Sequence, residues 1–350
     1  MAGTSIMEHF ASLSDPRIAR GKAHQLLDIV VLAICAVVSG AEGWEAIEEF
    51  GHTKLAWLRQ FVPLANGVPA HDTLARVLSR VSARGFEACF ASWVRACAEV
   101  SEGEVIAIDG KTSRRSHDRR SRKNALHLVS PWSTANGLVL ELKGCIVTID
   151  AMGCQAEIAA QIVAQKGDYA LAVKGNQAEL YTDIQDFFAT ARAAGFRGIK
   201  HDYYETVEKG HGRIEVRRYW VTPDLSGLGR AERWRGLKTI GLAEAERRIG
   251  ERVSIEQRVF ICSFDRGAEA FGRAVRDHWG IENSLHWVLD MTFREDESRI
   301  RRGEAPQNFA VLRRMALNLL KRETTMKKGV KQKRLKAGWD ENTLAKVLFT

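Results

Sequence analysis

The sequence lacks the cysteine patterns that mark disulfide-rich and zinc-binding proteins. Its six cysteines include no CxxC pair, and several lie within apolar runs such as residues 33–37. Neither a structural zinc site nor a disulfide framework is therefore indicated. We expect the cysteines to be small buried side chains in a protein of a reducing compartment.

Membrane-spanning and secretory segments are also missing. The longest apolar stretch, residues 29–38, is too short to cross a bilayer and predicts a buried helix. Glu8, His9 and Asp15 precede any apolar run, which does not fit a signal peptide. We find no internal repeat and no low-complexity linker, and we expect a cytoplasmic protein without a membrane partner.

The composition is that of a globular protein with an excess of positive charge. A chain of 350 residues is long enough for two or three domains with a sizeable core. The net charge of +9 favours a polyanionic partner such as nucleic acid, because each neutralised phosphate releases counterions. The alternative is a basic surface that serves only solubility.

The first hundred residues are expected to be helical. Residues 26–38 are apolar almost all round and end at Gly40, whereas residues 44–50 form a predicted amphipathic helix stopped by Gly51. Asp72 is a predicted N-cap for a helix over residues 74–81. A small bundle of this kind either binds DNA or serves packing alone.

The pattern changes near residue 104 to strands and helices in alternation, which indicates a mixed α/β sheet. Strands are predicted over residues 105–108, 125–132, 137–142, 145–149 and 169–173, and residues 200–265 are rich in further strands. Helices are predicted over residues 155–164, 180–194, 271–289 and 310–322, and a last helix over 339–348.

Two of the predicted strands end in aspartate, at Asp109 and Asp150. If these strands are neighbours, the two carboxylates lie close together and need a cation between them, and Mg²⁺ prefers carboxylate, phosphate and water oxygens. Two metals about 4 Å apart can activate a nucleophile and stabilise the leaving oxygen in phosphodiester cleavage. The alternative for each aspartate is the start of a turn.

A third carboxylate is available on the predicted helix over residues 271–289. Glu282 shares one helix face with His278 and His286, at a spacing of four residues on either side. The alternative for these three residues is the solvated face of an amphipathic helix.

Several motifs, in this order, resemble the H-repeat-associated (Rhs-element-linked) insertion-sequence transposases. The resemblance covers residues 9 to about 320, and its joint order is highly specific. The motifs are Asp15-Pro16-Arg17 and residues 107–112 (AIDGKT), 125–130 (ALHLVS), 149–155 (IDAMGCQ), 173–177 (VKGNQ), 210–215 (GHGRIE) and 278–283 (HWGIEN).

The resemblance implies an RNase H-like catalytic domain over residues 101–322, with a β-rich insertion at about 195–268. The sequence pattern predicts a helical N-terminal domain over residues 1–100 that binds DNA, and a basic tail over 323–350 after the catalytic domain. The implied activity is DDE transposition, in which insertion-sequence ends are cleaved and joined to target DNA. The implied cofactor is Mg²⁺, for which Mn²⁺ can substitute, and the implied partners are double-stranded DNA and further copies of the chain, on the nucleoid.

Asp109 and Asp150 match the two catalytic aspartates of the family, and Glu282 matches its glutamate. Related transposases carry this glutamate in a Tyr-Arg-Glu-Lys signature, and His278 stands here in the arginine position. Asp290, Glu295 and Asp296 are the alternatives for the third carboxylate.

The chain departs from the family just before Asp150. The predicted strand over residues 137–142 is separated from Cys145 by Lys143 and Gly144 alone, whereas a parallel connection needs roughly a dozen residues, usually a helix. The crossover helix before the Asp150 strand is therefore predicted to be missing. Three alternatives follow. The strand over residues 137–142 does not form, or the order of strands in the sheet changes around a hairpin, or the fold and the activity are impaired. The last alternative would leave a DNA-binding remnant.

Basic residues near the predicted site suggest contacts with the DNA backbone. The alternative is a set of solvated loops whose charge serves solubility. The predicted DNA-binding residues lie after Asp109, after the strand over 169–173, and in the glycine-rich turn of the insertion: Lys111, Arg114, Arg115, Arg119, Arg120, Lys174, His211 and Arg213.

Overall fold

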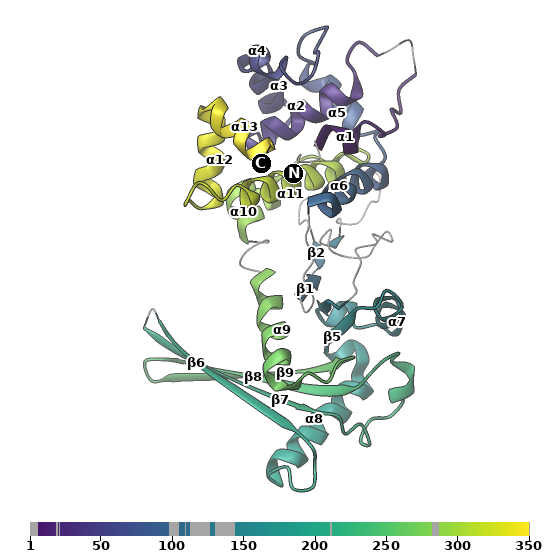
Figure 1. Cartoon of the computed structure of the whole chain (residues 1–350), viewed down its shortest axis with the longest axis vertical. Helices are drawn as coiled ribbons and strands as arrows, with labels where there is room; N and C mark the ends of the chain where they lie inside the picture. The colour runs from purple at the N-terminus through teal and green to yellow at the C-terminus, as the bar shows by residue number, and fades with distance from the viewer. Residues whose placement is uncertain are drawn as a thin grey trace. The chain divides into compact units, whose positions relative to one another are not determined.

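A computed structural model describes residues 6–18, 20, 22–97, 105–108, 110–112, 127–129, 144–210, 212–281 and 287–349. The chain forms two compact units, each built from segments that are distant in sequence (Figure 1). One unit contains residues 1–98, 111–131 and 283–350, and the other contains residues 99–110 and 132–282. The boundaries predicted at residues 100 and 322 follow the chain in order and remain a prediction.

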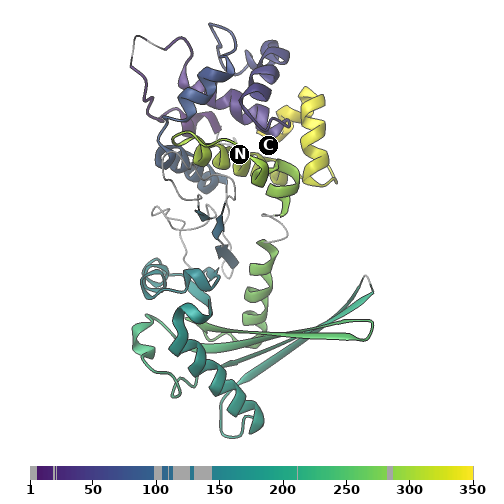
Figure 2. The same cartoon turned by 180° about the vertical axis from the view of Figure 1, so that it is seen from behind.

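The first unit is helical and combines the two ends of the chain. Its helices are α1 (Ile6–Phe10), α2 (Leu26–Val38), α3 (Trp44–Thr53), α4 (Leu55–Leu58), α5 (His71–Leu78), α6 (Ala83–Cys97), α10 (Trp287–Phe293), α11 (Ala305–Arg322), α12 (Val330–Trp339) and α13 (Glu341–Phe349). Helix α2 is buried on nearly all sides, as its apolar sequence predicts, and packs against α11. Figure 2 shows the N-terminal helices and the C-terminal helices within this same unit.

Two local predictions in this unit are wrong. Gly51 does not stop a helix but lies inside α3. A glycine is needed there because a Cβ atom would come within 2.6 Å of Val68 Cγ1. Asp72 is not an N-cap but a first-turn residue of α5, whose N-cap is Ala70. In both cases tertiary packing and the preceding backbone decide the helix end rather than the local residue type.

Helix α12 is joined to the unit by its basic side chains. Arg334 is 5% exposed, and its guanidinium donates to the backbone carbonyls of Val37 (3.1 Å), Ala41 (3.1 Å) and Thr292. Lys333 donates to the carbonyl of Leu320 at 3.1 Å, near the end of α11. These side chains satisfy carbonyl groups at helix ends, which helices leave without intrahelical partners.

The second unit contains a seven-stranded mixed sheet with the strand order β1-β4-β5-β9-β8-β7-β6. Strands β1, β4 and β5 are parallel, and the other neighbours pair antiparallel. The strands are β1 (Val105–Ile108), β4 (Ile146–Ile149), β5 (Asp168–Val173), β6 (Asp202–Gly210), β7 (Arg213–Thr222), β8 (Thr239–Ile249) and β9 (Arg252–Cys262). The predicted mixed α/β fold with a β-rich insertion is confirmed.

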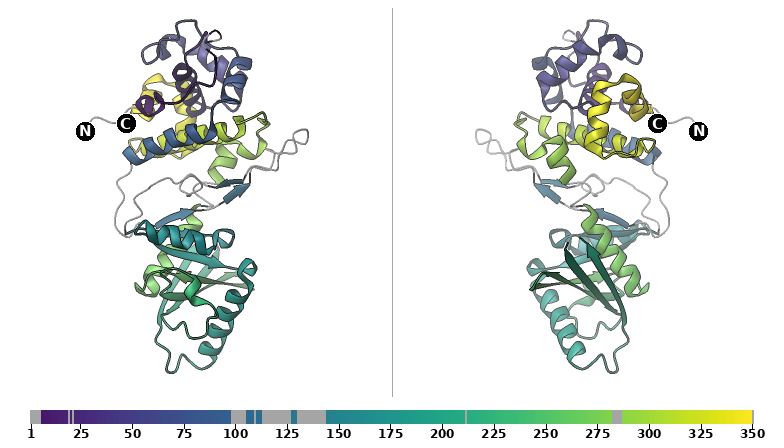
Figure 3. Two further views of the ribbon diagram at one scale, coloured as in Figure 1. Left: turned by 90° about the vertical axis from the view of Figure 1, so that its right-hand side faces the viewer. Right: turned by 90° about the vertical axis from the view of Figure 1, so that its left-hand side faces the viewer.

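Helices cover both faces of this sheet. Helix α9 (Gly267–Ile281) packs on one face, where Phe271 contacts Tyr219 and Phe260. Helices α7 (Ala156–Ala164) and α8 (Ala178–Ala193) contribute to the apolar core on the opposite face (Figure 3). The part of the sheet near β4 and β5 is therefore buried on both sides.

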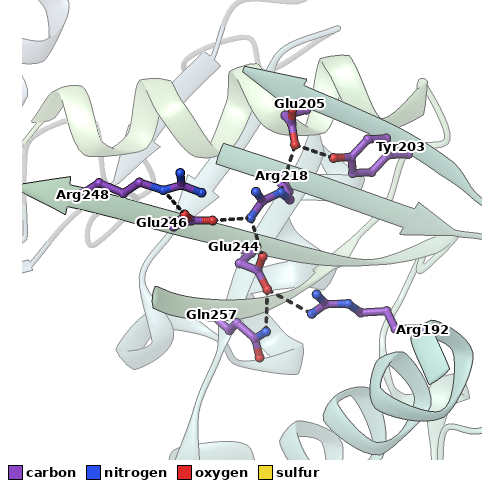
Figure 4. Close-up of polar contacts among 8 residues, drawn as sticks. All are labelled: Arg192, Tyr203, Glu205, Arg218, Glu244, Glu246, Arg248 and Gln257. Carbon is purple, nitrogen blue, oxygen red and sulfur yellow. Dashed lines mark hydrogen bonds and ion pairs between the residues drawn. The ribbon is translucent and has the colours of Figure 1, made fainter. Parts of the chain in front are cut away.

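The two hairpins β6–β7 and β8–β9 form the insertion. Away from the helices they are held by ion pairs rather than by apolar burial (Figure 4). The Arg218 guanidinium contacts Glu205 (2.9 Å), Glu244 (3.0 Å) and Glu246 (2.9 Å), which lie on β6 and β8. Arg192 of α8 reaches the same Glu244 at 3.0 Å.

The region of the predicted missing crossover is only partly described. Strands β2 (Gly110–Thr112) and β3 (His127–Val129) pair with each other in a separate sheet, and the predicted strand over 137–142 lies outside the described residues. Strand β4 nevertheless lies between β1 and β5, so the strand that leads to Asp150 keeps its place in the sheet. None of the helices in the described ranges is long and apolar enough to cross a membrane.

Candidate active site

Asp150 follows the carboxyl end of β4, the second strand of the parallel part of the sheet. Ile149 is in register with Ile108, and both strands run in the same direction. The two residues that precede Asp150 and Asp109 in the sequence therefore lie side by side. Asp150 itself is half-buried and begins a single turn of 3-10 helix, η2 (Ala151–Gly153).

The sequence of this turn is explained by its packing. A Cβ atom at position 153 would lie 2.2 Å from Ile149 Cγ2, so Gly153 lets the chain fold back over the end of β4. The next residue, Cys154, is fully buried, and burial raises the pKa of its thiol to about 12. It acts as a small apolar anchor for the turn and not as a reactive thiol.

A second turn, after β5, supports the first. Its backbone passes through Lys174 into the short helix η3 (Gly175–Gln177). The Asn176 side-chain amide donates to the carbonyl of Ala151 at 2.6 Å, and the Gln177 amide donates to the carbonyl of Cys154 at 3.1 Å. Motifs 149–155 and 173–177 thus form one hydrogen-bonded unit at the carboxyl edge of the parallel strands.

A side-chain hydrogen bond links helix α9 to Thr148 of β4, two residues before Asp150. The Thr148 hydroxyl lies 3.1 Å from His278 Nδ1, and Thr148 is 3% exposed. Residues 148 and 150 point to the same face of a strand, because side chains alternate along it. Asp150 therefore follows β4 on the face that α9 covers.

Of the three predicted catalytic carboxylates, the structure describes only Asp150. Asp109 and Glu282 lie outside the described residues, although α9 ends at Ile281, directly before Glu282 in the sequence. Among the residues that are described, no group of three or more His, Cys, Asp and Glu side chains could hold a metal ion.

The alternative candidates for the third carboxylate belong to the other unit. Asp290 lies in α10, and Glu295 and Asp296 lie in the short helix η6 (Glu295–Glu297) of the helical unit. Glu295 is 1% exposed, and its charge acts on the buried Arg313 of α11. Because Glu295 is buried in the helical core, its position fits a structural partner of Arg313.

The predicted DNA-binding residues are described only in part. Lys174 is exposed at the same sheet edge as Asp150, and Arg213 is at the tip of hairpin β6–β7, where its guanidinium pairs with Glu215 at 3.0 Å. Lys111 lies in β2, of which only the backbone is described. Outside the described residues lie Arg114, Arg115, Arg119, Arg120 and His211.

Three polar residues at this edge were not predicted from the sequence as site residues: Thr148, Asn176 and Gln177. The only available signal was the pair of motifs that contain or adjoin them, because their partners are 130, 25 and 23 residues away in the sequence. Such long-range hydrogen bonds leave no local periodicity from which they could be derived.

Comparison with known families agrees with this geometry. Residues 92–319 match the family described as "Transposase DDE domain", and residues 7–94 match the region described as "DDE_Tnp_1-associated". The chain belongs to the DDE transposase family. Its catalytic domain is RNase H-like, which confirms the fold class and the resemblance found in the sequence motifs.

Relatives match the chain over different lengths, in one case over nearly all of it. The "H repeat-associated putative transposase YhhI" of Escherichia coli K12 is 41% identical, with 98% of this chain and 97% of the relative covered. An "Uncharacterized protein in dhlA 3'region" of Xanthobacter autotrophicus is 43% identical over 73% of this chain and 92% of its own length. A shorter relative, "Inactive transposase YbfQ" of Escherichia coli K12, is 53% identical over 21% of this chain.

The first of these alignments is longer than the chain. It spans 371 positions but includes 98% of 350 residues, which is about 343 residues. About 28 aligned positions, the difference between 371 and 343, therefore have no residue in this chain. These positions are gaps within the matched part of this chain.

Proposed function

We propose that this transposase binds the ends of an insertion sequence, cleaves them in a metal-dependent reaction and joins them to target DNA. The observation that carries the proposal is the parallel pairing of β1 with β4 in the register Ile108 to Ile149. In this register the residues directly before the two catalytic aspartates, Asp109 and Asp150, are neighbours at the carboxyl end of the parallel strands. A pair of carboxylates at one edge is the arrangement that a two-metal phosphodiester reaction needs.

The donor chemistry of this edge fits Mg²⁺. Asp150 offers carboxylate oxygens on a turn that is braced by hydrogen bonds, and hard cations such as Mg²⁺ and Mn²⁺ prefer oxygen ligands. The residues that would hold the metal are Asp109, Asp150 and Glu282. When bound, the metal would activate water or a DNA 3′-hydroxyl and stabilise the leaving oxygen.

The position of α9 supports Glu282 over the alternatives in the helical unit. His278, four residues before Glu282 in the sequence, is hydrogen-bonded to Thr148 on the Asp150 face of β4. Glu295, by contrast, is 1% exposed in the helical unit, where its charge acts on the buried Arg313. We therefore assign the third carboxylate to Glu282.

Lys174 is the described basic residue that best suits a contact with substrate DNA. Its side chain is exposed, and it follows β5, the strand beside β4. A lysine at this edge would neutralise a phosphate close to the reacting bond. The basic stretch after Asp109 and the turn with His211 and Arg213 would extend the DNA contact, and two DNA ends would be brought together by a homo-oligomer on the nucleoid.

The test uses purified protein with labelled DNA that carries the element's ends, in the presence of Mg²⁺ or Mn²⁺. We expect cleavage at the element boundary, and we expect the Asp150→Ala variant to bind the same DNA without cleaving it. Cleavage that persists in Asp150→Ala would rule out the assigned site. Joining of the freed ends to a target plasmid separates a transposase from a general RNase H-like nuclease.

A second function is favoured by the gaps that this chain has in the alignment with its relative. About 28 positions of the alignment have no residue in this chain, and the sequence predicts that the crossover helix before β4 is missing. The chain would then be a DNA-binding remnant of a transposase. Equal, metal-independent binding of element ends by the wild type and Asp150→Ala, without cleavage in either, is the result this alternative predicts.

A further inference from the structure

Two sequence motifs meet at the candidate site, and most of their residues have no part in the reaction proposed above. In motif 173–177, Asn176 and Gln177 direct their side-chain amides at the carbonyls of Ala151 and Cys154, at 2.6 and 3.1 Å. Both acceptors belong to the turn that follows Asp150. The two side-chain amides therefore bind the backbone of that turn on either side of Met152 and Gly153.

The turn is anchored by the buried side chains of Ala151 and Cys154, but it has few hydrogen bonds of its own. Its internal hydrogen bonds run from the Gly153 amide to the Asp150 carbonyl (3.1 Å) and from the Cys154 amide to the Ala151 carbonyl (3.2 Å). These are bonds of a single 3-10 turn, whose geometry is poorer than that of an α-helix. Met152, in the middle of the turn, is 57% exposed and adds little packing.

We propose that Asn176 and Gln177 are positioning residues that clamp the turn after β4 and thereby fix the Asp150 carboxylate for metal binding. This inference rests on the proposed function of Asp150 as a metal ligand. Metal sites require their ligands within about 0.5 Å of the productive geometry, and the groups that support a ligand set its orientation. The two amides act through the backbone of the turn and do not touch the metal.

The clamp differs in its expected effects from a group that merely stabilises the fold. Asn176 is exposed, and the Ala151 carbonyl keeps its bond from the Cys154 amide when Asn176 is removed. Loss of such an accessible hydrogen bond changes stability little, because water replaces the donor. The turn would remain but with a looser Asp150, so metal affinity should fall while the melting temperature stays nearly constant.

The experiment measures Mn²⁺ binding to the full-length protein with a duplex that carries the element's ends, by electron paramagnetic resonance of free Mn²⁺. Asn176→Leu keeps the side-chain size but removes the donor. We expect its Mn²⁺ dissociation constant to rise by roughly tenfold, in line with losses of supporting groups at other metal sites. Gln177→Leu should show a smaller rise, because its hydrogen bond is longer.

Gln185→Ala is the matched control. It removes a side-chain amide that donates to the Tyr181 hydroxyl on the exposed surface of α8, in the same unit. Its Mn²⁺ affinity and cleavage rate should equal those of the wild type, and thermal melting of all variants is recorded in parallel.

The outcomes separate this inference from the proposed function. If the wild type binds Mn²⁺ no better than Asp150→Ala, the proposed function fails. If the wild type binds Mn²⁺ and Asp150→Ala does not, but Asn176→Leu binds Mn²⁺ as well as the wild type, the clamp alone is refuted. A loss of affinity in Asn176→Leu that is equalled in Gln185→Ala also refutes the clamp.

Discussion

Arg17 shows how a single side chain can organise a loop in this chain. Its guanidinium donates to both carboxylate oxygens of Asp15, at 2.9 and 2.8 Å, and to the carbonyl of His24 at 2.8 Å. These contacts tie together the segment that leads into α2. The hydrogen bond from Arg17 lowers the pKa of the Asp15 carboxyl from 3.8 to about 2.

A pH-dependent contribution to stability follows from this lowered pKa. Because the folded carboxyl has the lower pKa, the contribution is complete above pH 3.8 and is lost as the pH falls through about 2. Asp15→Asn should therefore unfold at lower urea than the wild type at pH 7, and the difference should shrink between pH 4 and 2. In an Arg17→Met background the pH-dependent difference should be smaller but not absent, because the backbone amide of residue 17 and Lys22 still contact the Asp15 carboxyl.

Glycines show the limits of prediction at this scale. Gly40 ends the α2 segment with φ +116°, as the sequence suggests, but Gly51 is required by a neighbour that is distant in the sequence, and Gly153 by the strand residue onto which its own turn folds back. The closest atom to a Cβ at position 51 belongs to Val68, and the closest to one at 153 belongs to Ile149. A local sequence signal marks a glycine but does not tell a helix stop from a close contact.

At the scale of elements, apolar content decides how far prediction reaches. The predicted strands at 145–149 and 169–173 nearly coincide with β4 and β5, because both are buried runs of apolar residues. Within residues 200–265 the sequence predicts a first strand over residues 203–207, which is shorter than β6 (Asp202–Gly210). Their outer halves are exposed and held by charges, which give no strong strand signal.

The outer sheet should depend on Arg218 as a shared partner of three carboxylates. Glu244 is 5% exposed; burial acts to raise its pKa, but bonds from Gln257, Arg192 and Arg218 outweigh burial and keep the pKa lowered. Arg218→Met should lower the free energy of unfolding by about 2 kcal/mol, since it leaves a buried charge with fewer partners. Urea unfolding at pH 7 measures this loss.

Arg258→Met provides the comparison for that variant. Arg258 lies on β9 in the same sheet, but its partner Glu256 is 60% exposed at the side chain. An exposed pair is worth about 0–1 kcal/mol, so this variant should unfold close to the wild type. Equal losses in the two variants would show that the shared arginine has no special role in the sheet.

At the scale of the whole molecule, the basic C-terminal segment shows why charge patterns are ambiguous. The sequence gives a run of Lys and Arg that suits a DNA-contacting tail, and the structure has helices α12 and α13 there, within the helical unit. Burial lowers the pKa of Arg334 to about 10, and its guanidinium lies 4.4 Å over the Phe293 ring. Sequence alone does not separate such an arginine from its exposed neighbours.

Arg334→Met should therefore destabilise the helical unit. It leaves the carbonyls of Val37, Ala41 and Thr292 without this donor, and we expect a loss of about 3 kcal/mol in the free energy of unfolding. Lys331→Met, at an exposed position of the same helix, should change stability by less than about 0.5 kcal/mol. Loss of helix by circular dichroism during urea titration distinguishes the two variants.

The discontinuous make-up of the two units has a consequence for synthesis on the ribosome. The sheet-containing unit is complete once residue 282 has emerged, whereas the helical unit lacks residues 283–350, including α11, which packs against α2. Residues 39–304 separate α2 from α11, and at roughly 5–20 residues per second their translation leaves the apolar helix α2 without this partner for roughly 10–50 seconds. During that interval the nascent N-terminal segment is the part of the chain most in need of chaperones, although it is made first.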